Sequence, residues 1–236
     1  EEEIFFTALS RFVSTENLSR DWNSYRIRND DDIISEILER NGLPQHTKPD
    51  VITHYLALLG DAIASRAVST SPIIGATALL NQVRRFSTVG IATANLRQAA
   101  KLRLETVDFW QHVSSYAFGA DGGGHKYEIL ARAVAVLDMP RTRMVYIGDN
   151  VNDVIAGLEN AVHFIGFSTD AIRRQQLAAA RREMDQALSL QLGAAHARSA
   201  RAVERDQRRP ARHRVAAERA GVAARRPVHH VGLGDD

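Results

Sequence analysis

Two aspartates follow an apolar run in the second half of the chain. Residues 145–147 are apolar and lead into Gly148-Asp149, and Asp153 follows four residues later. Carboxylates with this spacing, at a turn between a strand and a helix, can converge on one hard cation, and oxygen ligands suit Mg²⁺. The same residues also fit a structural role, in which Asp149 shapes a turn and Asp153 caps a helix. The spacing predicts a magnesium site at Asp149 and Asp153, with the structural role as its alternative.

A threonine stands at the end of an earlier apolar run. Residues 88–93 suit a buried parallel strand that ends at Thr93, and Ala94 and Asn95 follow before a predicted helix. A hydroxyl at this point, together with the first backbone N–H groups of the helix, forms a small cradle for an anion. The alternative is that Thr93 only caps the helix.

A lysine opens a predicted helix after a run of three glycines. Lys126 is one of three lysines in the chain, with Lys48 and Lys101, and it follows residues 122–124 and His125. A lysine is a compact charge that suits a phosphate or a pair of carboxylates. The alternative is a solvated lysine beside a flexible loop. The neighbouring His125 could act as an acid or a base, although a lone exposed histidine more often has no such role.

The first part of the chain has the apolar spacing of helices. Helices are predicted from residue 4, from Asp30, where three aspartates stand at the start, and from about 49 to 67. The second helix has an apolar stripe and ends at Asn41-Gly42; the stripe consists of Ile33, Ile34, Ile37 and Leu38. Residues 1–70 are therefore predicted to form an all-helical region.

Helices and strands alternate after this region. The predicted order is helix 75–85, strand 88–93, helix 96–104, strand 113–118, helix 125–137, strand 144–147, helix 153–161 and strand 163–167. Such alternation predicts an α/β fold over residues 71–180, with a Rossmann-like parallel sheet flanked by helices. Active sites lie at the carboxyl ends of such strands, which is where Thr93 and Asp149 fall.

Composition limits the classes of protein. The chain has 236 residues, 44% of them hydrophobic, and it has no cysteine, which excludes disulfides and thiolate chemistry. No apolar run approaches the roughly 20 residues that cross a bilayer, so we expect no membrane partner and a cytoplasmic location.

The basic charge of the chain lies in its last part. Residues 181–236 hold twelve Arg and seven Asp or Glu, a balance of +5 against −3 for the rest. Three interpretations remain open: a basic arm that binds nucleic acid, a solvated Arg/Ala helix, and a disordered tail produced by a shifted reading frame. Aromatic residues are absent after Phe167, so bases would lack a stacking platform, and the frameshifted tail is preferred.

The order of these features resembles a known enzyme superfamily. Thr93 at a strand end, Lys126 at a helix start and Gly-Asp-x-x-x-Asp at the next strand end resemble the second, third and fourth motifs of haloacid dehalogenase (HAD) hydrolases. The helices before them resemble the C1 cap of that family, and residues 26–31 resemble the cap segment that meets substrate in phosphoglycolate-phosphatase-like members. The resemblance covers about residues 4–180 and implies Mg²⁺-dependent hydrolysis of a small phosphorylated metabolite.

The resemblance also assigns roles to the matching residues. Thr93, with Ala94 and Asn95, would bind the transferred phosphoryl group, and Lys126 would offset its charge and that of the nucleophile. Asp149 would hold Mg²⁺ directly, while Asp153 would assist or orient the waters of the ion.

The first motif of the family, Asp-x-Asp on an apolar strand, is not found. Asp30 and Asp32 have the spacing but begin a helix, and Asp235-Asp236 lies in the last part of the chain. We therefore expect that a strand has been lost upstream and that the chain as printed has little or no phosphatase activity. The alternatives are a non-catalytic HAD-like protein that binds phosphate or a partner, a truncated product and a phosphomutase. The aspartate pair argues against a dehalogenase, which needs no metal in that family.

Overall fold

The computed structural model describes residues 2–184 and 186. The helices are α1 (Glu2–Ser10), α2 (Asp30–Arg40), α3 (Lys48–Ala64), α4 (Ala76–Val83), α5 (Arg97–Glu105), α6 (Trp110–Val113), α7 (Lys126–Val136) and α8 (Val151–Glu159). The strands are β1 (Ile91–Ala92), β2 (Ala117–Phe118), β3 (Val145–Gly148) and β4 (His163–Gly166). Short 3₁₀ helices are η1 (Thr15–Asn17), η2 (Trp22–Ser24), η3 (Gln45–Thr47), η4 (Ser114–Tyr116) and η5 (Arg141–Arg143), and residues 171–184 are helical. The prediction for residues 181–236 falls almost wholly outside the described residues.

The first three helices pack around a shared apolar core, which includes the apolar stripe predicted for the second helix. The predicted stripe of α2 is fully buried, and Leu9 of α1 and Leu59 of α3 lie in the same cluster. Asn29 caps α2 by accepting a hydrogen bond from the Asp32 amide, and the helix ends at Asn41 before Gly42, whose φ of 65° suits glycine. The structure has a helix at each of the three positions predicted within residues 1–70.

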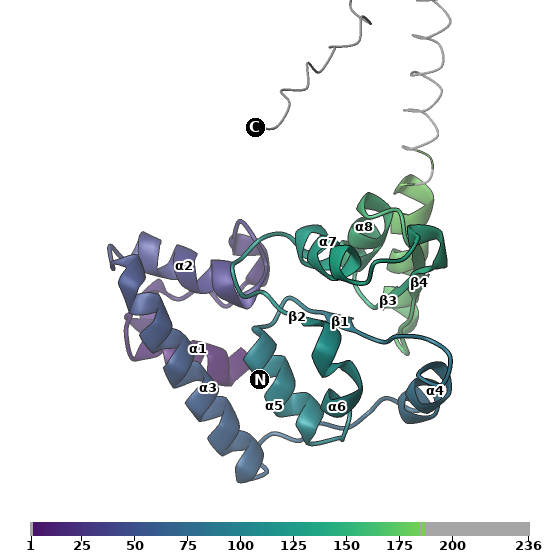
Figure 1. Cartoon of the computed structure of the whole chain (residues 1–236). Coiled ribbons are helices and arrows are strands. Elements are labelled where there is room, and N and C mark those ends of the chain that lie inside the picture. The colour runs from purple at the N-terminus through teal and green to yellow at the C-terminus, as the bar shows by residue number, and fades with distance from the viewer. Residues whose placement is uncertain (1, 185, 187–236) are drawn as a thin grey trace, which may run out of the picture. The chain divides into compact units, whose positions relative to one another are not determined.

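This core extends into the α/β part of the chain. Leu96, which precedes α5, and Ala99 within α5 are buried in the cluster formed by α1, α2 and α3. Helix α5 packs directly on α3 (Figure 1). The two parts share apolar burial as well as polar contacts.

Four short strands pair in parallel, as predicted, but they form two sheets among the described residues. In the first sheet Ile91 of β1 faces Ala117 of β2. In the second sheet β3 pairs with β4 over four residues, from Val145 opposite His163 to Gly148 opposite Gly166. The expected single sheet is thus present as two parallel pairs, β1–β2 and β3–β4.

Helix α7 contributes to the burial of both sheets. Ala92 and Phe118 of the first sheet, and Tyr146 of the second, pack against the cluster that contains Leu130 and Val134 of α7. Helix α7 also packs along α8, and Figure 1 shows both helices beside β3 and β4. One face of each sheet is therefore covered by the same helix.

The opposite face of the second sheet is apolar and exposed. Val145 is 57% exposed, and Ile147 and its cross-strand partner Ile165 are each 51% exposed. Tyr146 lies between the two β3 residues and points to the covered face, as the alternation of a strand requires.

The predicted strand 113–118 is wrong over most of its length. Val113 is buried at the end of α6, residues 114–116 form η4, and only Ala117 and Phe118 are extended. The Ser114-Ser115 pair, a sequence that favours turns, interrupts the expected run. Because η4 lies where a partner for residues 88–90 would be, β1 is also shorter than predicted.

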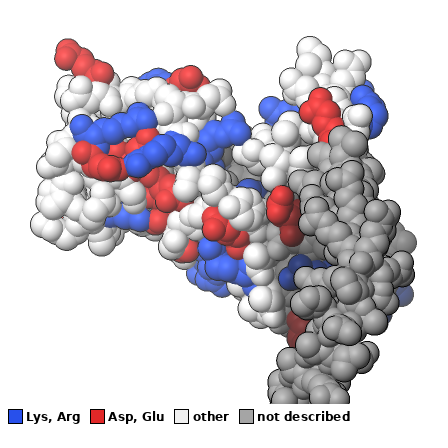
Figure 2. Space-filling view, turned by 90° about the horizontal axis from the view of Figure 1, so that it is seen from above, with Lys and Arg blue, Asp and Glu red and all other residues white. Residues whose placement is uncertain are grey.

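Acidic and basic side chains are interleaved on the face of the molecule in Figure 2. Several charged side chains of residues 2–64 form ion pairs: Arg20 with Glu3, Arg26 with Glu36 and Glu39, Arg40 with Glu36, and Lys48 with Asp31. In the part of the chain that the structure describes, no helix is long and apolar enough to span a bilayer.

Candidate active site

Asp153 is the centre of a buried polar network. Its carboxylate, 5% exposed, accepts a hydrogen bond from the Tyr146 hydroxyl at 2.7 Å and from the amides of Asp149 and Asn150 at 3.1 Å each. The Lys126 Nζ lies 3.2 Å from the same carboxylate. Asp153 also completes a capping box with Asn150 at the start of α8. The N-cap of α8 is thus Asn150, and Asp153 supports the start of the helix from the N3 position while it also holds Lys126.

Tyr146 is a buried donor to this network. Burial, followed by the carboxylates of Asp153 and Asp149, raises the pKa of Tyr146 above the ordinary tyrosine value of 10.0. The phenol therefore keeps its proton in the folded protein and donates to Asp153. This role of Tyr146 could not be foreseen from the sequence, because a tyrosine in an apolar strand carries no signal of its partner.

The raised pKa of Tyr146 predicts a loss of stability in alkali. Above pH 10 the unfolded chain releases the phenol proton while the folded protein retains it, so the free energy of unfolding falls as pH rises. We expect Tyr146→Phe to cost about 1 kcal/mol at neutral pH, since a hydrogen bond is lost, and to make the fall above pH 10 shallower. Urea unfolding at pH 8, 10 and 11 measures both effects.

Two other tyrosines matter for the interpretation of this measurement. Tyr25, whose pKa burial also raises, keeps its own alkaline contribution in the variant. Tyr127→Phe, at a tyrosine that is 37% exposed, is the matched control and should follow the unaltered protein. Equal slopes for Tyr146→Phe and the unaltered protein would contradict the assignment.

Lys126 begins α7 and points into the protein. Its side chain is only 19% exposed and pairs with Asp153 of α8, so the solvated alternative does not describe it. His125 is the N-cap residue; its amide donates to Glu128 Oε2 at 2.6 Å, and its ring stacks on Tyr127 at 5.4 Å. This position gives His125 a structural role.

Asp149 is the carboxylate of the pair that faces solvent. Its side chain is 66% exposed and accepts from Arg173 at 3.3 Å. A carboxylate has about four acceptor positions, and those of Asp153 are taken by one hydroxyl, one ammonium and two amides. Mg²⁺ binds proteins through one or two carboxylates, with waters and substrate phosphate as the other ligands. The residues fit such an ion if Asp149 is the direct ligand and Asp153 supports the loop.

Thr93 lies directly after β1. Its amide donates to Phe118 O at 2.9 Å, and its hydroxyl accepts from the Asn95 amide at 3.2 Å. The N-cap of α5 is Leu96, so Thr93 does not cap that helix. The loop 93–96 therefore stands at the carboxyl end of the strand, as expected for a phosphate cradle.

The first turn of α2 binds this loop. The Asp30 amide donates to Ala94 O at 3.0 Å, and the Asp30 carboxylate accepts from the Leu96 amide at 2.9 Å. Asn95 Nδ2 lies 3.4 Å from the same carboxylate. Asp30 is 4% exposed, so these bonds are shielded from water.

The same turn binds the loop that precedes Lys126. Asp32 accepts from the Gly124 amide at 2.7 Å, while Asn29 Nδ2 donates to Gly124 O at 2.7 Å. Gly123 has a φ of 72°, and a Cβ on it would lie 2.9 Å from Asp32 Oδ1. A glycine is required there both for the backbone and for the close approach.

A third contact reaches α8. Arg28 donates to Asn152 Oδ1 at 3.2 Å and to Asn23 Oδ1 at 2.8 Å. Residues 28–32, the linking segment, thus contact the Thr93 loop, the Lys126 loop and the helix that contains Asp153. One segment thus contacts an element from each of the three predicted parts of the site.

The Asp-x-Asp spacing of the linking segment serves a structural role. Asp30 and Asp32 are occupied by the two loops, which leaves neither as a nucleophile. The sequence suggested only a helix start at these residues, since their partners lie more than sixty positions away. Asp235 and Asp236 fall outside the described residues. No group of three or more His, Cys, Asp or Glu side chains suited to a metal occurs within residues 2–184 and 186.

Comparison with known proteins places these residues in one family. Residues 13–167 match the family model described as "Haloacid dehalogenase-like hydrolase". No curated protein matches the chain. The matched stretch contains the linking segment, Thr93, Lys126, Asp149 and Asp153.

Proposed function

Because the chain belongs to the haloacid dehalogenase-like hydrolase family, we propose that its site serves the Mg²⁺-dependent hydrolysis of a phosphate monoester. The observation that carries the proposal is the ion pair of Lys126 with Asp153 beside the solvent-facing Asp149. A partly buried lysine and a loop carboxylate are the charges that a phosphate and a divalent cation require.

Each residue of the candidate active site has its own role in this proposal. The Thr93 hydroxyl and the Ala94 amide donate to the phosphoryl oxygens, since the amides of Thr93, Asn95 and Leu96 donate to other groups of the protein. The Lys126 ammonium offsets the charge that gathers on these oxygens, and Asp153 fixes its position. Asp149 holds the cation, which supplies further charge stabilisation to the phosphoryl group when it is bound.

The nucleophile is proposed to come from a further strand. In the described part of the chain β1 pairs only with β2, and β3 only with β4, while α7 packs against both sheets. We propose that a strand carrying Asp-x-Asp lies between β1 and β3, where its carboxyl end would stand beside Thr93 and Asp149. One aspartate would attack phosphorus, with release of the alcohol, and water would then hydrolyse the aspartyl-phosphate.

The helices of residues 2–64 are proposed to act as a cap. Arg28 supports this role, because it is exposed and reaches α8 from the helical region through neutral amide oxygens. Its charge is therefore available to an anionic group of the substrate.

Mg²⁺ binding tests the proposed site without requiring turnover. We expect Asp149→Asn to weaken Mg²⁺ binding roughly tenfold, because a direct carboxylate ligand is lost. Isothermal titration of the unaltered protein and the variant, each in the presence of inorganic phosphate, measures the change.

Asp61→Asn is the matched control for this experiment. Asp61 is an exposed carboxylate on α3, far in sequence from the motifs. The control should bind Mg²⁺ like the unaltered protein. Equal Mg²⁺ affinity in Asp149→Asn and the control would exclude Asp149 as the ligand.

A non-catalytic phosphate-binding protein is the second candidate. This candidate is favoured because the carboxylates of Asp30 and Asp32 accept hydrogen bonds from the Leu96 and Gly124 amides. The described site is then left without a nucleophile. Persistent Mg²⁺ and phosphate binding without turnover, even after a nucleophile strand is added, would establish this second function.

A further inference from the structure

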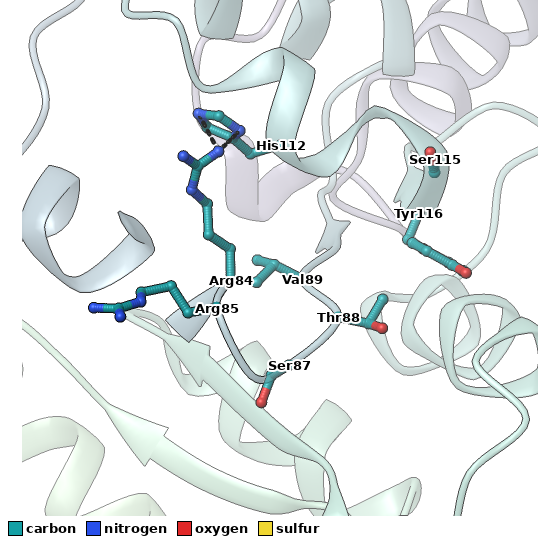
Figure 3. Close-up of a pocket in the computed structure, with 8 residues that line it drawn as sticks. All are labelled: Arg84, Arg85, Ser87, Thr88, Val89, His112, Ser115 and Tyr116. Carbon is teal, nitrogen blue, oxygen red and sulfur yellow. Dashed lines mark hydrogen bonds between the residues drawn. The ribbon is translucent and has the colours of Figure 1, made fainter. Parts of the chain in front are cut away.

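A hollow of about 460 Å³ lies away from the candidate active site. Its lining includes Thr88 and Val89, just before β1, and Ser115 and Tyr116, just before β2 (Figure 3). Parallel strands have their amino ends at one edge, so the hollow lies at the edge opposite to the Thr93 loop. It is therefore distinct from the proposed phosphatase site.

Two arginines give this hollow its charge. Arg84 and Arg85, at the end of α4, line it, and none of the eight lining residues is acidic. The Arg84 Nη1 lies 2.8 Å from His112 Nδ1, and no ion pair of Arg84 or Arg85 occurs among the described residues. By contrast, Arg40 of α2 and Lys48 of α3 each form an ion pair with a carboxylate.

Hydroxyl groups supply neutral donors to the same hollow. Figure 3 shows Arg84 extended toward His112, with the Thr88 and Tyr116 side chains on the other side of Val89. Ser87 and Ser115 complete the set of hydroxyl residues in the lining. Arg85 extends in a different direction from Arg84, and the Arg84 guanidinium is the one that lies beside His112.

We propose that this hollow binds a small phosphate-bearing molecule at a second site. A guanidinium fork matches two phosphate oxygens, and neighbouring hydroxyls can donate to the others. A cation at a helix end also interacts with the helix dipole, but that interaction does not account for His112 and the hydroxyls, which come from other elements. The site needs neither Mg²⁺ nor any residue of the proposed phosphatase site.

Titration with inorganic pyrophosphate in EDTA tests this site. We expect binding with a Kd on the order of 1 mM, as suits an open site with one engaged guanidinium, and shifts of the backbone NMR signals of residues 84–89 and 112–116. Arg84→Ala should weaken binding about fivefold, and Arg85→Ala less, because Arg85 points elsewhere. Arg84→Lys keeps the charge without the fork and should be intermediate.

Two control variants separate this hollow from the remaining cationic side chains of the protein. Arg11→Ala removes an exposed arginine on the first helical region, and it should bind pyrophosphate as before. Lys126→Ala removes the lysine of the candidate active site, which is itself proposed to bind phosphate, so its readout is the set of NMR shifts at residues 84–89 and 112–116, which should stay unchanged. Binding that is lost with Lys126→Ala and kept with Arg84→Ala would assign the anion to the phosphatase site and overturn the proposal. Absence of binding, or equal binding of sulfate at matched ionic strength, would overturn it as well. Failure of Mg²⁺ binding at Asp149 would leave this result unchanged.

Discussion

Joining an apolar strand that ends in Asp-x-Asp to the start of this chain is expected to produce Mg²⁺-dependent hydrolysis of p-nitrophenyl phosphate. The chain as printed is expected to hydrolyse this ester at the background rate. The reason is that Thr93, Lys126 and Asp149 can bind a phosphoryl group but cannot attack it. Loss of a nucleophile typically lowers kcat by many orders of magnitude, so a gain on the order of 10⁴-fold is expected.

The matched control carries Asn-x-Asp on the same added strand. This control should fold in the same way and remain inactive, because its first side chain is not a nucleophile. In the active form, Arg28→Ala should raise KM more than it lowers kcat if the helical region meets the substrate. Robust Mg²⁺-dependent turnover by the chain without the added strand would contradict the proposal.

Asp153→Ala is expected to lower the free energy of unfolding by about 3 kcal/mol. The substitution leaves the largely buried Lys126 without its carboxylate and removes the acceptor of two amides and the Tyr146 hydroxyl. The surroundings cannot easily rearrange, since Gly148 approaches so closely that a Cβ on it would lie 2.4 Å from Asp153 Cβ. Chemical denaturation followed by circular dichroism measures the loss.

Asp61→Ala provides the comparison for this effect. Asp61 is exposed on α3, where substitutions typically change the free energy of unfolding by less than about 0.5 kcal/mol. Lys126→Met should recover part of the loss when combined with Asp153→Ala, because the unpaired charge is then removed. A loss in Asp153→Ala no larger than that of the control would show that the network does not stabilise the fold.

Local sequence patterns predicted the helices and the order of the motifs. The stripe of α2 and its closing Asn41-Gly42 depend only on neighbouring residues, so periodicity and end signals sufficed to place this helix. The Gly-Asp-x-x-x-Asp spacing likewise predicted a turn from strand to helix, and Asp149 directly follows β3 while Asp153 lies in the first turn of α8. The family match agrees with the resemblance of these motifs.

Features that depend on distant partners were not predictable in this way. The division into two strand pairs depends on which strand edges meet, and η4 replaced part of a predicted strand. The hydrogen bonds of Asp30 with the Thr93 loop and of Tyr146 with Asp153 are tertiary contacts. The residues next to Asp30 and Tyr146 in the sequence do not indicate these partners. The roles of Thr93 and Lys126 in chemistry stay predictions.

The burial of Leu96 and Ala99 among α1, α2 and α3 affects how chimeras of this protein can be built. A graft of residues 2–64 from this chain onto a related hydrolase would arrive without the α5 surface that completes its interior. Recombination at the boundary near residue 70 would then yield chimeras that express poorly, whereas transfer together with α5 would keep the interior intact. In this molecule the helical region and α5 form one packing unit, although α4 and β1 lie between them in the chain.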